Sequence, residues 1–224
     1  MDINKIKSQF PIFSKKIHGK QLVYLDSSNS SQKPLVVINR LNGFYKNEFS
    51  NIGRSIHSLA VNATNKFEET RISVKNFINA KFKEEIIFTK NATEAINLVA
   101  TTFGQQNIKE GDEIIITELE HHSNYVPWHF LRETKKAIIK FAPINEDGDI
   151  IIEKFQKLIT DKTKIIAITH LSNVTGTIVP IKEIIEIARK KNIPVLVDGC
   201  QSAPHIKIDV LDLDCDFYAF SGHK

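Results

Sequence analysis

Several features that mark other classes of protein are scarce or missing in this sequence. Its 224 residues include two cysteines, Cys200 and Cys215, and no CxxC pair. A disulfide framework is therefore excluded, and we expect two reduced thiols in a cytoplasmic protein. No apolar run reaches the length of a membrane-spanning helix. The N-terminus mixes both charges and lacks an apolar core, which excludes a secretory signal.

Motifs for several ligand classes are missing as well. The sequence contains no glycine-rich dinucleotide fingerprint and no P-loop, and it lacks the HExxH and CxxC spacings of common zinc sites. Lysine and arginine number 30 against 26 aspartates and glutamates, a net charge of +4 that is spread along the chain. We therefore expect no nucleic-acid partner, no membrane association and no metal site.

The composition that remains is that of a folded domain. Hydrophobic residues make up 42% and charged residues 25%, which excludes intrinsic disorder, collagen and coiled coil. From residue 85 on, short β-branched runs alternate with amphipathic stretches. The β-branched runs predict strands at 85–88, 112–117, 137–142, 164–170, 194–198 and 216–220. The amphipathic stretches predict helices at 91–103, 127–136, 152–159 and 181–191.

This alternation predicts an α/β fold with a mostly parallel sheet flanked by helices. In such sheets ligands bind at the carboxyl ends of the strands. Polar clusters follow the expected strands at 91–94, 120–122, 170–173, 198–202 and 221–224. Since parallel strands end at one edge, these clusters are expected to meet there.

The first part of the chain has a different pattern. It contains an irregular polar segment at 25–33 and a predicted long helix at 58–78. We predict that residues 1–80 form an N-terminal extension, which packs on the main domain or on a partner subunit. Residues 81–224 would form the main, cofactor-binding domain.

Two residues at expected strand ends could carry charge-based chemistry. Asp198 follows an apolar strand, and a carboxylate there needs a partner, such as a protonated ring nitrogen of a cofactor. The alternative is an N-cap for the next segment. Lys224 follows another expected strand, and a partly desolvated lysine can form a Schiff base. The alternative there is a solvated surface lysine.

Two further clusters add a ring and an anion site. His121 and His122 could stack on a planar ligand or move protons. Residues 91–94 open a helix at a strand end, which suits either an anion site or an ordinary capping box. Together the clusters supply a phosphate cradle, a stacking ring, an acid and an amine. Pyridoxal 5'-phosphate requires that set.

Several motifs also occur in the order of one known family. The most specific are EHHSNYVPW at 120–128 and SGHK at 221–224. Others are RSIH at 54–57, ATEAINLV at 92–99, SNVTGT at 172–177 and VDGCQ at 197–201. On these residues the chain resembles the N-terminal part of a SufS-type cysteine desulfurase. That family lies in the class V aminotransferase group of fold-type-I pyridoxal phosphate enzymes, so the resemblance implies the large domain of that fold.

The resemblance also implies roles for single residues. Lys224 would hold pyridoxal 5'-phosphate as a Schiff base and then move protons. His121 would stack on the cofactor ring and act in acid–base steps. Asp198 would pair with the pyridinium nitrogen, and Gln201 would donate toward the phenolate oxygen. Further contacts would reach the phosphate from Ala92, Thr93, Ser221 and His223, and the substrate from Arg54. Asn173 would touch the substrate carboxylate or the phenolate.

The implied reaction takes sulfur from L-cysteine and leaves L-alanine. The sulfur would be held as a persulfide and passed to a SufE- or SufU-like acceptor for iron–sulfur cluster assembly, by an enzyme that is a homodimer. Two alternatives stay open. One is a selenocysteine lyase or another class V enzyme, and the other is a non-catalytic, truncated remnant that binds cofactor or partner.

The sequence departs from the family pattern at several positions. Residues 27–31 replace a Ser-Ala-Ala segment, Gly53 stands where histidine is common, and Cys200 stands where alanine is usual. The family's persulfide cysteine and its small C-terminal domain lie beyond the position of Lys224. We therefore expect an inactive fragment that ends at the Schiff-base lysine, with Cys215 as a structural thiol.

Overall fold

The computed structural model describes residues 2–224, which divide into two compact units. One unit comprises the chain up to Val74 together with His223 and Lys224, and the other comprises Lys75–Gly222. The predicted domain boundaries near residue 80, and the predicted packing of the N-terminal extension, stay predictions. None of the helices described over residues 2–224 has the length and apolar character needed to cross a bilayer.

The smaller unit is built from short elements and two longer helices. In chain order they are α1 (Ile3–Lys7), η1 (Pro11–Ser14), β1 (Lys16–Ile17), β2 (Lys20–Gln21), α2 (Leu35–Asn47) and α3 (Ser58–Phe77), the last of which ends in the larger unit. His18 and Gly19 turn the β1–β2 hairpin with positive φ angles of 52° and 76°. Helix α2 contains no buried residue, and an ion pair joins Glu48, just after it, to Lys66 of α3.

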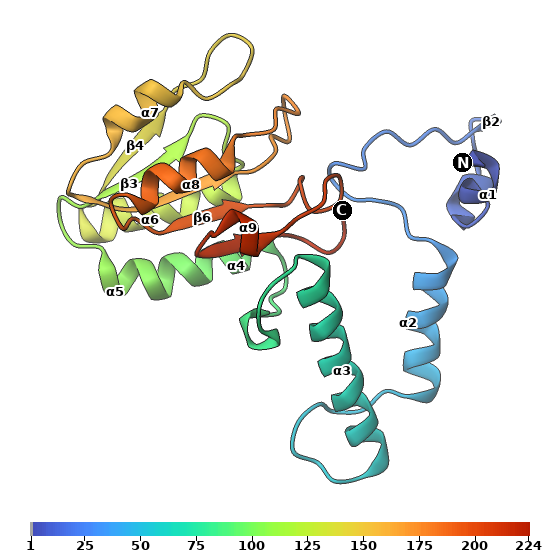
Figure 1. Ribbon diagram of the computed structural model, residues 1–224. Coiled ribbons are helices and arrows are strands. Elements are labelled where there is room, and N and C mark those ends of the chain that lie inside the picture. Colours follow the sequence, from blue (N-terminus) through green and yellow to red (C-terminus); the bar gives the residue numbers. More distant parts are fainter. Residues whose placement is uncertain (1) are drawn as a thin grey trace. The chain divides into compact units, whose positions relative to one another are not determined.

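The larger unit is a five-stranded, fully parallel sheet with the strand order β4-β3-β5-β6-β7 (Figure 1). Its strands are β3 (Glu113–Thr117), β4 (Ile138–Ala142), β5 (Thr163–Thr169), β6 (Val195–Asp198) and β7 (Phe217–Ala219). Its helical segments are η2 (Lys83–Glu85), α4 (Ala92–Val99), η3 (Ala100–Gly104), α5 (Gln105–Asn107), η4 (His122–Asn124), α6 (Val126–Lys135), α7 (Ile152–Leu158), α8 (Ile181–Arg189) and α9 (Val210–Leu213). The predicted parallel α/β architecture is confirmed.

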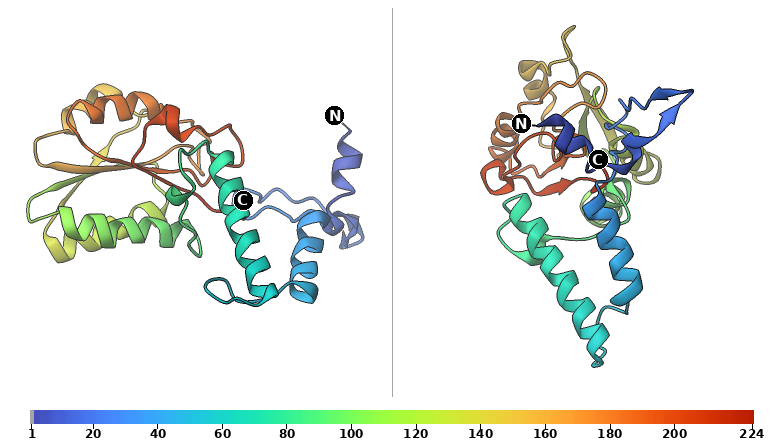
Figure 2. Two further views of the ribbon diagram at one scale, coloured as in Figure 1. Left: turned by 60° about the horizontal axis from the view of Figure 1, so that its bottom comes forward. Right: turned by 90° about the vertical axis from the view of Figure 1, so that its right-hand side faces the viewer.

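Alternate residues of the buried strands face two separate cores. Ile115 and Ile166 pack with Phe155 of α7 and Ile184 of α8 on one face. On the other face, Ile114, Ile116 and Ile165 pack with Ile96, Trp128 and Leu131, which come from α4 and α6. Figure 1 and the left-hand view of Figure 2 show α7 and α8 on one side of the sheet and α4 and α5 on the other. Trp128 and Leu131 place α6 on the same side as α4. Because both faces are covered, the central strands β3, β5 and β6 are mostly apolar and buried.

The order of the strands places a switch point between β3 and β5. The chain leaves β3, crosses one face through α6 and returns in β4 at the edge. It then crosses the opposite face through α7 and returns in β5, on the other side of β3. Connections that diverge in this way open a crevice beyond the carboxyl ends of the two strands, where α/β proteins bind ligands.

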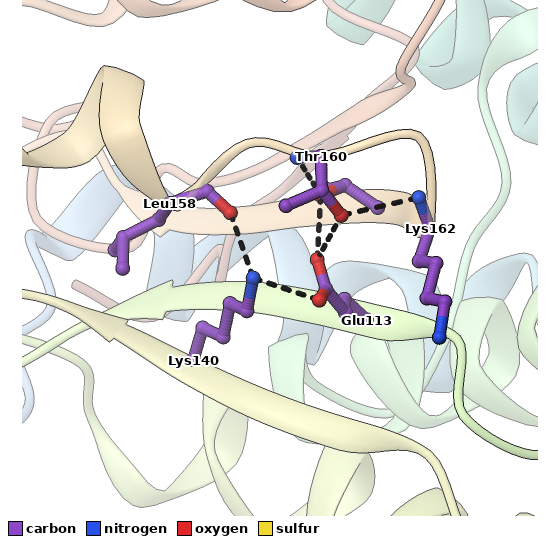
Figure 3. A network of polar contacts seen from close by, with 6 residues as sticks. Glu113, Lys140, Leu158, Thr160 and Lys162 are labelled. Atoms are coloured by element: carbon purple, nitrogen blue, oxygen red, sulfur yellow. Dashed lines mark hydrogen bonds and ion pairs between the residues drawn. The ribbon is translucent and has the colours of Figure 1, made fainter.

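A polar network ties together the amino ends of β3, β4 and the α7–β5 loop (Figure 3). Glu113 accepts from Lys140 Nζ at 2.7 Å and from Thr160 Oγ1 at 2.6 Å, and Lys140 also donates to the Leu158 carbonyl oxygen at 3.0 Å. Burial acts to raise the pKa of Glu113, but the hydrogen bonds from Lys140 and Thr160 outweigh it and hold that pKa below its usual value. The Glu113–Lys140 ion pair therefore stabilises this end of the sheet.

One predicted strand does not form. The structure has a 3-10 turn at Lys83–Glu85 and no strand assigned at residues 86–88. The Glu85 side chain accepts from the backbone N–H groups of Lys81 and Phe82, which curls the chain at the point where the strand was expected to start. The other five predicted strands and the predicted helices are present, with ends that differ by up to four residues.

Candidate functional site

Four strand ends of the larger unit carry polar side chains to the carboxyl edge of the sheet. After β3 come Glu120 and His121, after β5 comes His170, after β6 come Asp198 and the residues that follow it, and after β7 comes Ser221. Strand pairing sets their order across the edge, since Thr169 lies opposite Asp198 and Asp198 lies opposite Ala219. The convergence that the topology predicted is present within this unit.

Asp198 is the last residue of β6, and only 3% of it is exposed. One carboxylate oxygen accepts from the backbone N–H of Cys200 at 3.0 Å. This turn-closing bond is the kind that the capping alternative requires. No lysine or arginine of residues 2–224 forms an ion pair with Asp198. A buried carboxylate without a cation suits a protonated nitrogen of a ligand.

The turn after Asp198 rests directly on an aromatic ring. A Cβ atom added to Gly199 would overlap the Tyr218 ring, so only glycine fits. The Tyr218 hydroxyl lies 2.7 Å from Ser202 Oγ and 3.2 Å from His170 Nδ1. Burial raises the pKa of Tyr218 and lowers the pKa of His170. Both groups therefore stay neutral beneath the turn that carries Asp198.

The N-terminus of α4 lies beside the end of β7. Asn91 caps the helix by accepting from the Glu94 N–H at 2.9 Å, and the Glu94 carboxylate accepts in return from the Lys90 N–H. The N–H of Ala92 donates to Ser221 Oγ at 3.3 Å. Thr93, the next residue, is exposed. Asn91 thus caps the helix, whose N-terminus has two hydroxyl groups nearby, which is the chemistry that binds a phosphate.

His121 opens the short turn η4. Its Nδ1 lies 2.8 Å from Ser123 Oγ and accepts from the Ser123 N–H at 3.1 Å. The residue as a whole is exposed. The Ser123 contacts orient the ring while its flat face stays accessible, as stacking on a ligand requires.

Glu120 is the most densely bonded carboxyl of this edge. One oxygen accepts from Thr117 Oγ1 at 2.6 Å and from the Thr169 N–H at 2.9 Å. The other accepts from Asn124 Nδ2 at 2.6 Å. Burial, assisted by the nearby charge of Asp198, outweighs these hydrogen bonds and raises the pKa of Glu120 to about 7.

The remaining predicted residues fall into two groups. Gln201 is buried next to the Asp198 turn, whereas Asn173 is exposed in the loop after β5. Arg54, His223 and Lys224 belong to the smaller unit, where the His223 carbonyl oxygen accepts from the Ser31 N–H at 3.1 Å. The roles predicted for all ten site residues stay predictions.

Sequence reasoning missed the supports of the site. Glu120, His170, Ser202 and Tyr218 received no role, although the first three lie in the polar clusters expected after the strands and Tyr218 lies in a predicted strand. A usable signal was Gly199, because a glycine directly after a buried acid often marks a close approach of backbone to another group.

The donor set fits pyridoxal 5'-phosphate. The buried Asp198 without an ion-pair partner suits the ring nitrogen, and the α4 N-terminus with Ser221 suits the phosphate. His121 offers a ring face within the same unit. Among residues 2–224, no group of three His, Cys, Asp or Glu side chains is arranged to hold a metal ion.

Comparisons with known proteins agree with this chemistry. The chain is 50% identical over its full length to a probable cysteine desulfurase of Halalkalibacterium halodurans, of which it covers 55%. The structure matches an apo cysteine desulfurase from Thermococcus onnurineus NA1 with a TM-score of 0.92 and 35% identity, over 99% of this chain and 53% of that one. It also matches SspA in complex with cysteine, with a TM-score of 0.83 and 27% identity, over 90% of this chain and 57% of that one.

The chain thus spans about half the length of the first curated relative it matches. The structural matches confirm the predicted fold of the larger unit as that of pyridoxal phosphate-dependent enzymes. Residues 23–224 match the Aminotransferase class-V family, which is nearly the whole chain. With the buried acid, the helix N-terminus and the relatives in agreement, this chain belongs to the class V aminotransferase family, whose cofactor is the predicted pyridoxal 5'-phosphate.

Proposed function

We propose that the protein is a SufS-type cysteine desulfurase, which converts L-cysteine to L-alanine and passes the sulfur on as a persulfide for iron–sulfur cluster assembly. The observation that carries this proposal is Asp198, a buried acid without an ion-pair partner in residues 2–224, beside the Ala92–Ser221 contact. The relatives named cysteine desulfurase supply the reaction class.

Asp198, Gln201 and His121 would hold the cofactor ring. The carboxylate of Asp198 keeps the ring nitrogen protonated, and Gln201 donates toward the phenolate oxygen. His121 covers one face of the ring. Held by these residues, pyridoxal 5'-phosphate would supply an electron sink for the substrate's α-carbon.

The phosphate would bind at the start of α4. The N–H groups near Ala92 and Thr93, together with the hydroxyl groups of Thr93 and Ser221, provide donors, and the helix dipole favours a dianion there. His223 adds a further donor from the segment after β7. These contacts orient the cofactor without taking part in proton transfer.

Lys224 would hold the cofactor covalently and then carry protons on Nζ, while His121 accepts and returns a proton at its ring nitrogen. Asn173 and Arg54 would bind the substrate. Each of these roles is an expectation for the loaded protein, and each predicts a loss of turnover on replacement.

Neither thiol of the chain suits the role of persulfide carrier. Burial raises the pKa of Cys215 to about 12, so its thiolate form is scarce. Cys200 sits half-buried with Sγ 3.8 Å from Ser221 Oγ, which places it against the proposed phosphate site. The proposal therefore assigns the persulfide to neither Cys200 nor Cys215.

The partners follow from the same reaction. A SufE- or SufU-like protein would accept the sulfur, and a second copy of the chain would complete a homodimer. Cys200 and Cys215 form no disulfide, which agrees with a reducing compartment such as the cytoplasm.

The test is the visible absorbance of the protein, purified as its gene encodes it and supplied with pyridoxal 5'-phosphate. We expect a yellow protein that loses the band in the Lys224→Ala variant and keeps it in a matched Lys190→Ala variant, which changes an exposed lysine after α8. Wild type without the band would contradict the proposal.

Product analysis separates the reaction classes. L-cysteine should yield equal amounts of alanine and released or transferred sulfur. Turnover of L-selenocysteine alone would indicate the lyase instead, and cofactor binding without any turnover would indicate a remnant.

A further inference from the structure

The Glu120 carboxyl joins three segments that meet at the switch point of the sheet. Through Thr117 Oγ1 it binds the end of β3, through the Thr169 N–H it binds the end of β5, and through Asn124 Nδ2 it binds the turn η4. All three heavy-atom distances are between 2.6 and 2.9 Å. No other carboxyl at this edge connects so many elements among the residues described.

The directions of these hydrogen bonds are fixed by the partners. Trp128 Nε1 can only donate, and it donates to Asn124 Oδ1 at 3.1 Å. Asn124 must therefore turn its Nδ2 toward Glu120. The Thr169 N–H can also only donate. Glu120 consequently has to accept at both oxygens, which a carboxyl group does and a primary amide does not.

The third partner is adaptable. Thr117 Oγ1 accepts from the Leu119 N–H at 3.1 Å and can either donate to Glu120 or accept from it. A neutral Glu120 can thus keep all its contacts by donating to Thr117, and an ionised one by accepting from it. Burial and the charge of Asp198 favour the neutral form, since they raise the pKa of Glu120 to about 7.

Glu120 lies between the two groups assigned to the cofactor ring. It directly precedes His121 in the chain, and its partner Thr169 is the residue paired with Asp198 across β5 and β6. A displacement of Glu120 would therefore move the turn that carries His121 relative to the strand end that faces Asp198.

We propose that Glu120 is a positioning residue: by binding Asn124 and Thr169 together, it sets the spacing between the His121 ring and the Asp198 carboxylate. This inference rests on the proposed function for the identity of the ring that enters between them. The link between Glu120 and the turn itself does not depend on a bound cofactor.

The first test uses Glu120→Gln in the protein as its gene encodes it, without cofactor. The amide nitrogen introduced there would face Asn124 Nδ2, so two donors would meet and Asn124 would turn away from Trp128. Trp128 is the one tryptophan of these 224 residues, so the difference in emission between wild type and variant reports this turn. We expect a changed emission in Glu120→Gln and an unchanged one in Glu118→Gln, a matched control whose exposed carboxylate binds the Ile144 N–H.

A second variant restores the match of hydrogen-bond donor and acceptor between positions 120 and 124. In the Glu120→Gln/Asn124→Asp double variant, the new amide donates to the new carboxylate, whose other oxygen still accepts from Trp128 Nε1. We expect wild-type fluorescence to return. Should Glu120→Gln fail to fold, recovery of a folded protein by the double variant supports the proposal equally. A double variant no closer to wild type than the single one would overturn the proposal.

The cofactor gives an independent readout. Titration with pyridoxal 5'-phosphate should show binding weakened about tenfold in Glu120→Gln, the loss expected for one hydrogen bond, and restored to within about threefold in the double variant. Wild type that binds no cofactor would overturn the proposed function. Wild type that binds it, with Glu120→Gln identical in affinity and fluorescence, would overturn the role of Glu120 alone.

Discussion

Strand β3 has a buried or half-buried glutamate near each end, and the two have opposite electrostatics. Glu113, at the amino end, contacts Lys140 at 2.7 Å and has a lowered pKa. Glu120, beyond the carboxyl end, accepts only from neutral donors and has a pKa raised to about 7. The same residue type therefore lies near both ends of one strand, with its pKa shifted in opposite directions.

This difference separates the part of the sheet that holds the fold from the part that binds a ligand. At the amino edge, Lys140 pairs with Glu113 and Lys164 pairs with Asp112. At the carboxyl edge, Asp198 and Glu120 lie close enough to affect each other and have no lysine or arginine ion-pair partner in residues 2–224. An edge that keeps unpaired acids is suited to a positively charged group from a ligand.

The largest expected effect concerns the close contact between Gly199 and the Tyr218 ring at the carboxyl edge of the sheet. Gly199→Ala should destabilise the protein by roughly 3 kcal/mol, because its Cβ would overlap the Tyr218 ring. Gly111→Ala, at the amino edge, meets no atom within 4 Å and should cost about 1 kcal/mol, from its φ of +77° alone. Urea unfolding of both variants measures the contrast. Equal losses would show that Tyr218 moves aside freely.

The next effect comes from removing the Lys140–Glu113 ion pair at the amino edge. Lys140→Met keeps the apolar stem but leaves Glu113 without its cation, which should cost roughly 2.5 kcal/mol at neutral pH. The loss should shrink as the pH falls through the pKa of Glu113, because a protonated carboxyl needs no ammonium partner. Lys164→Met, which removes a more exposed pair with Asp112 at 3.8 Å, should cost less than about 1 kcal/mol. A pH-independent loss in Lys140→Met would contradict the pairing.

The carboxyl edge should show the reverse dependence on pH. The pKa of Glu120 is raised from 4.5 to about 7 in the folded protein, so the folded state holds this proton more tightly than the unfolded chain. Its contribution to stability is complete below pH 4.5 and is lost as the pH rises through about 7. Between these values, wild type should lose on the order of 2 kcal/mol relative to Glu120→Gln, whose amide does not titrate. Parallel unfolding free energies across this pH range would refute the raised pKa.

The smallest effect concerns the hydrogen bond from Thr160 to Glu113. Thr160→Val removes one donor to the carboxylate, together with the acceptor of the Lys162 N–H, and should cost about 1 kcal/mol. Thr134→Val, on the exposed side of α6, removes only a bond within its own helix and should stay within about 0.5 kcal/mol of wild type. Thermal unfolding resolves the two. A larger loss for Thr134→Val would place the critical threonine outside the network.

β-branched runs were sufficient to predict five of the strands, because strands covered on both faces, such as β3, β5 and β6, are rich in apolar residues. The same pattern gave a wrong prediction at residues 85–88, where no strand forms. There the Glu85 side chain binds the backbone N–H groups of Lys81 and Phe82 and bends the chain. The edge that carries Asp198 and His121 followed from parallel topology alone. Which acids are paired, and how the Tyr218 ring supports Gly199, could not be foreseen, since both depend on residues about twenty or more positions apart.

The sequence by itself determined the parallel α/β fold, the edge where polar residues gather and the motifs of the class V family. These follow from local patterns and from the order of elements along the chain. Only the tertiary structure decided which charges are neutralised, because strand order placed Lys140 against Glu113 and left Asp198 and Glu120 without a cation within residues 2–224. Charge states in a protein interior depend on what lies within a few ångströms, and folding alone brings those neighbours together.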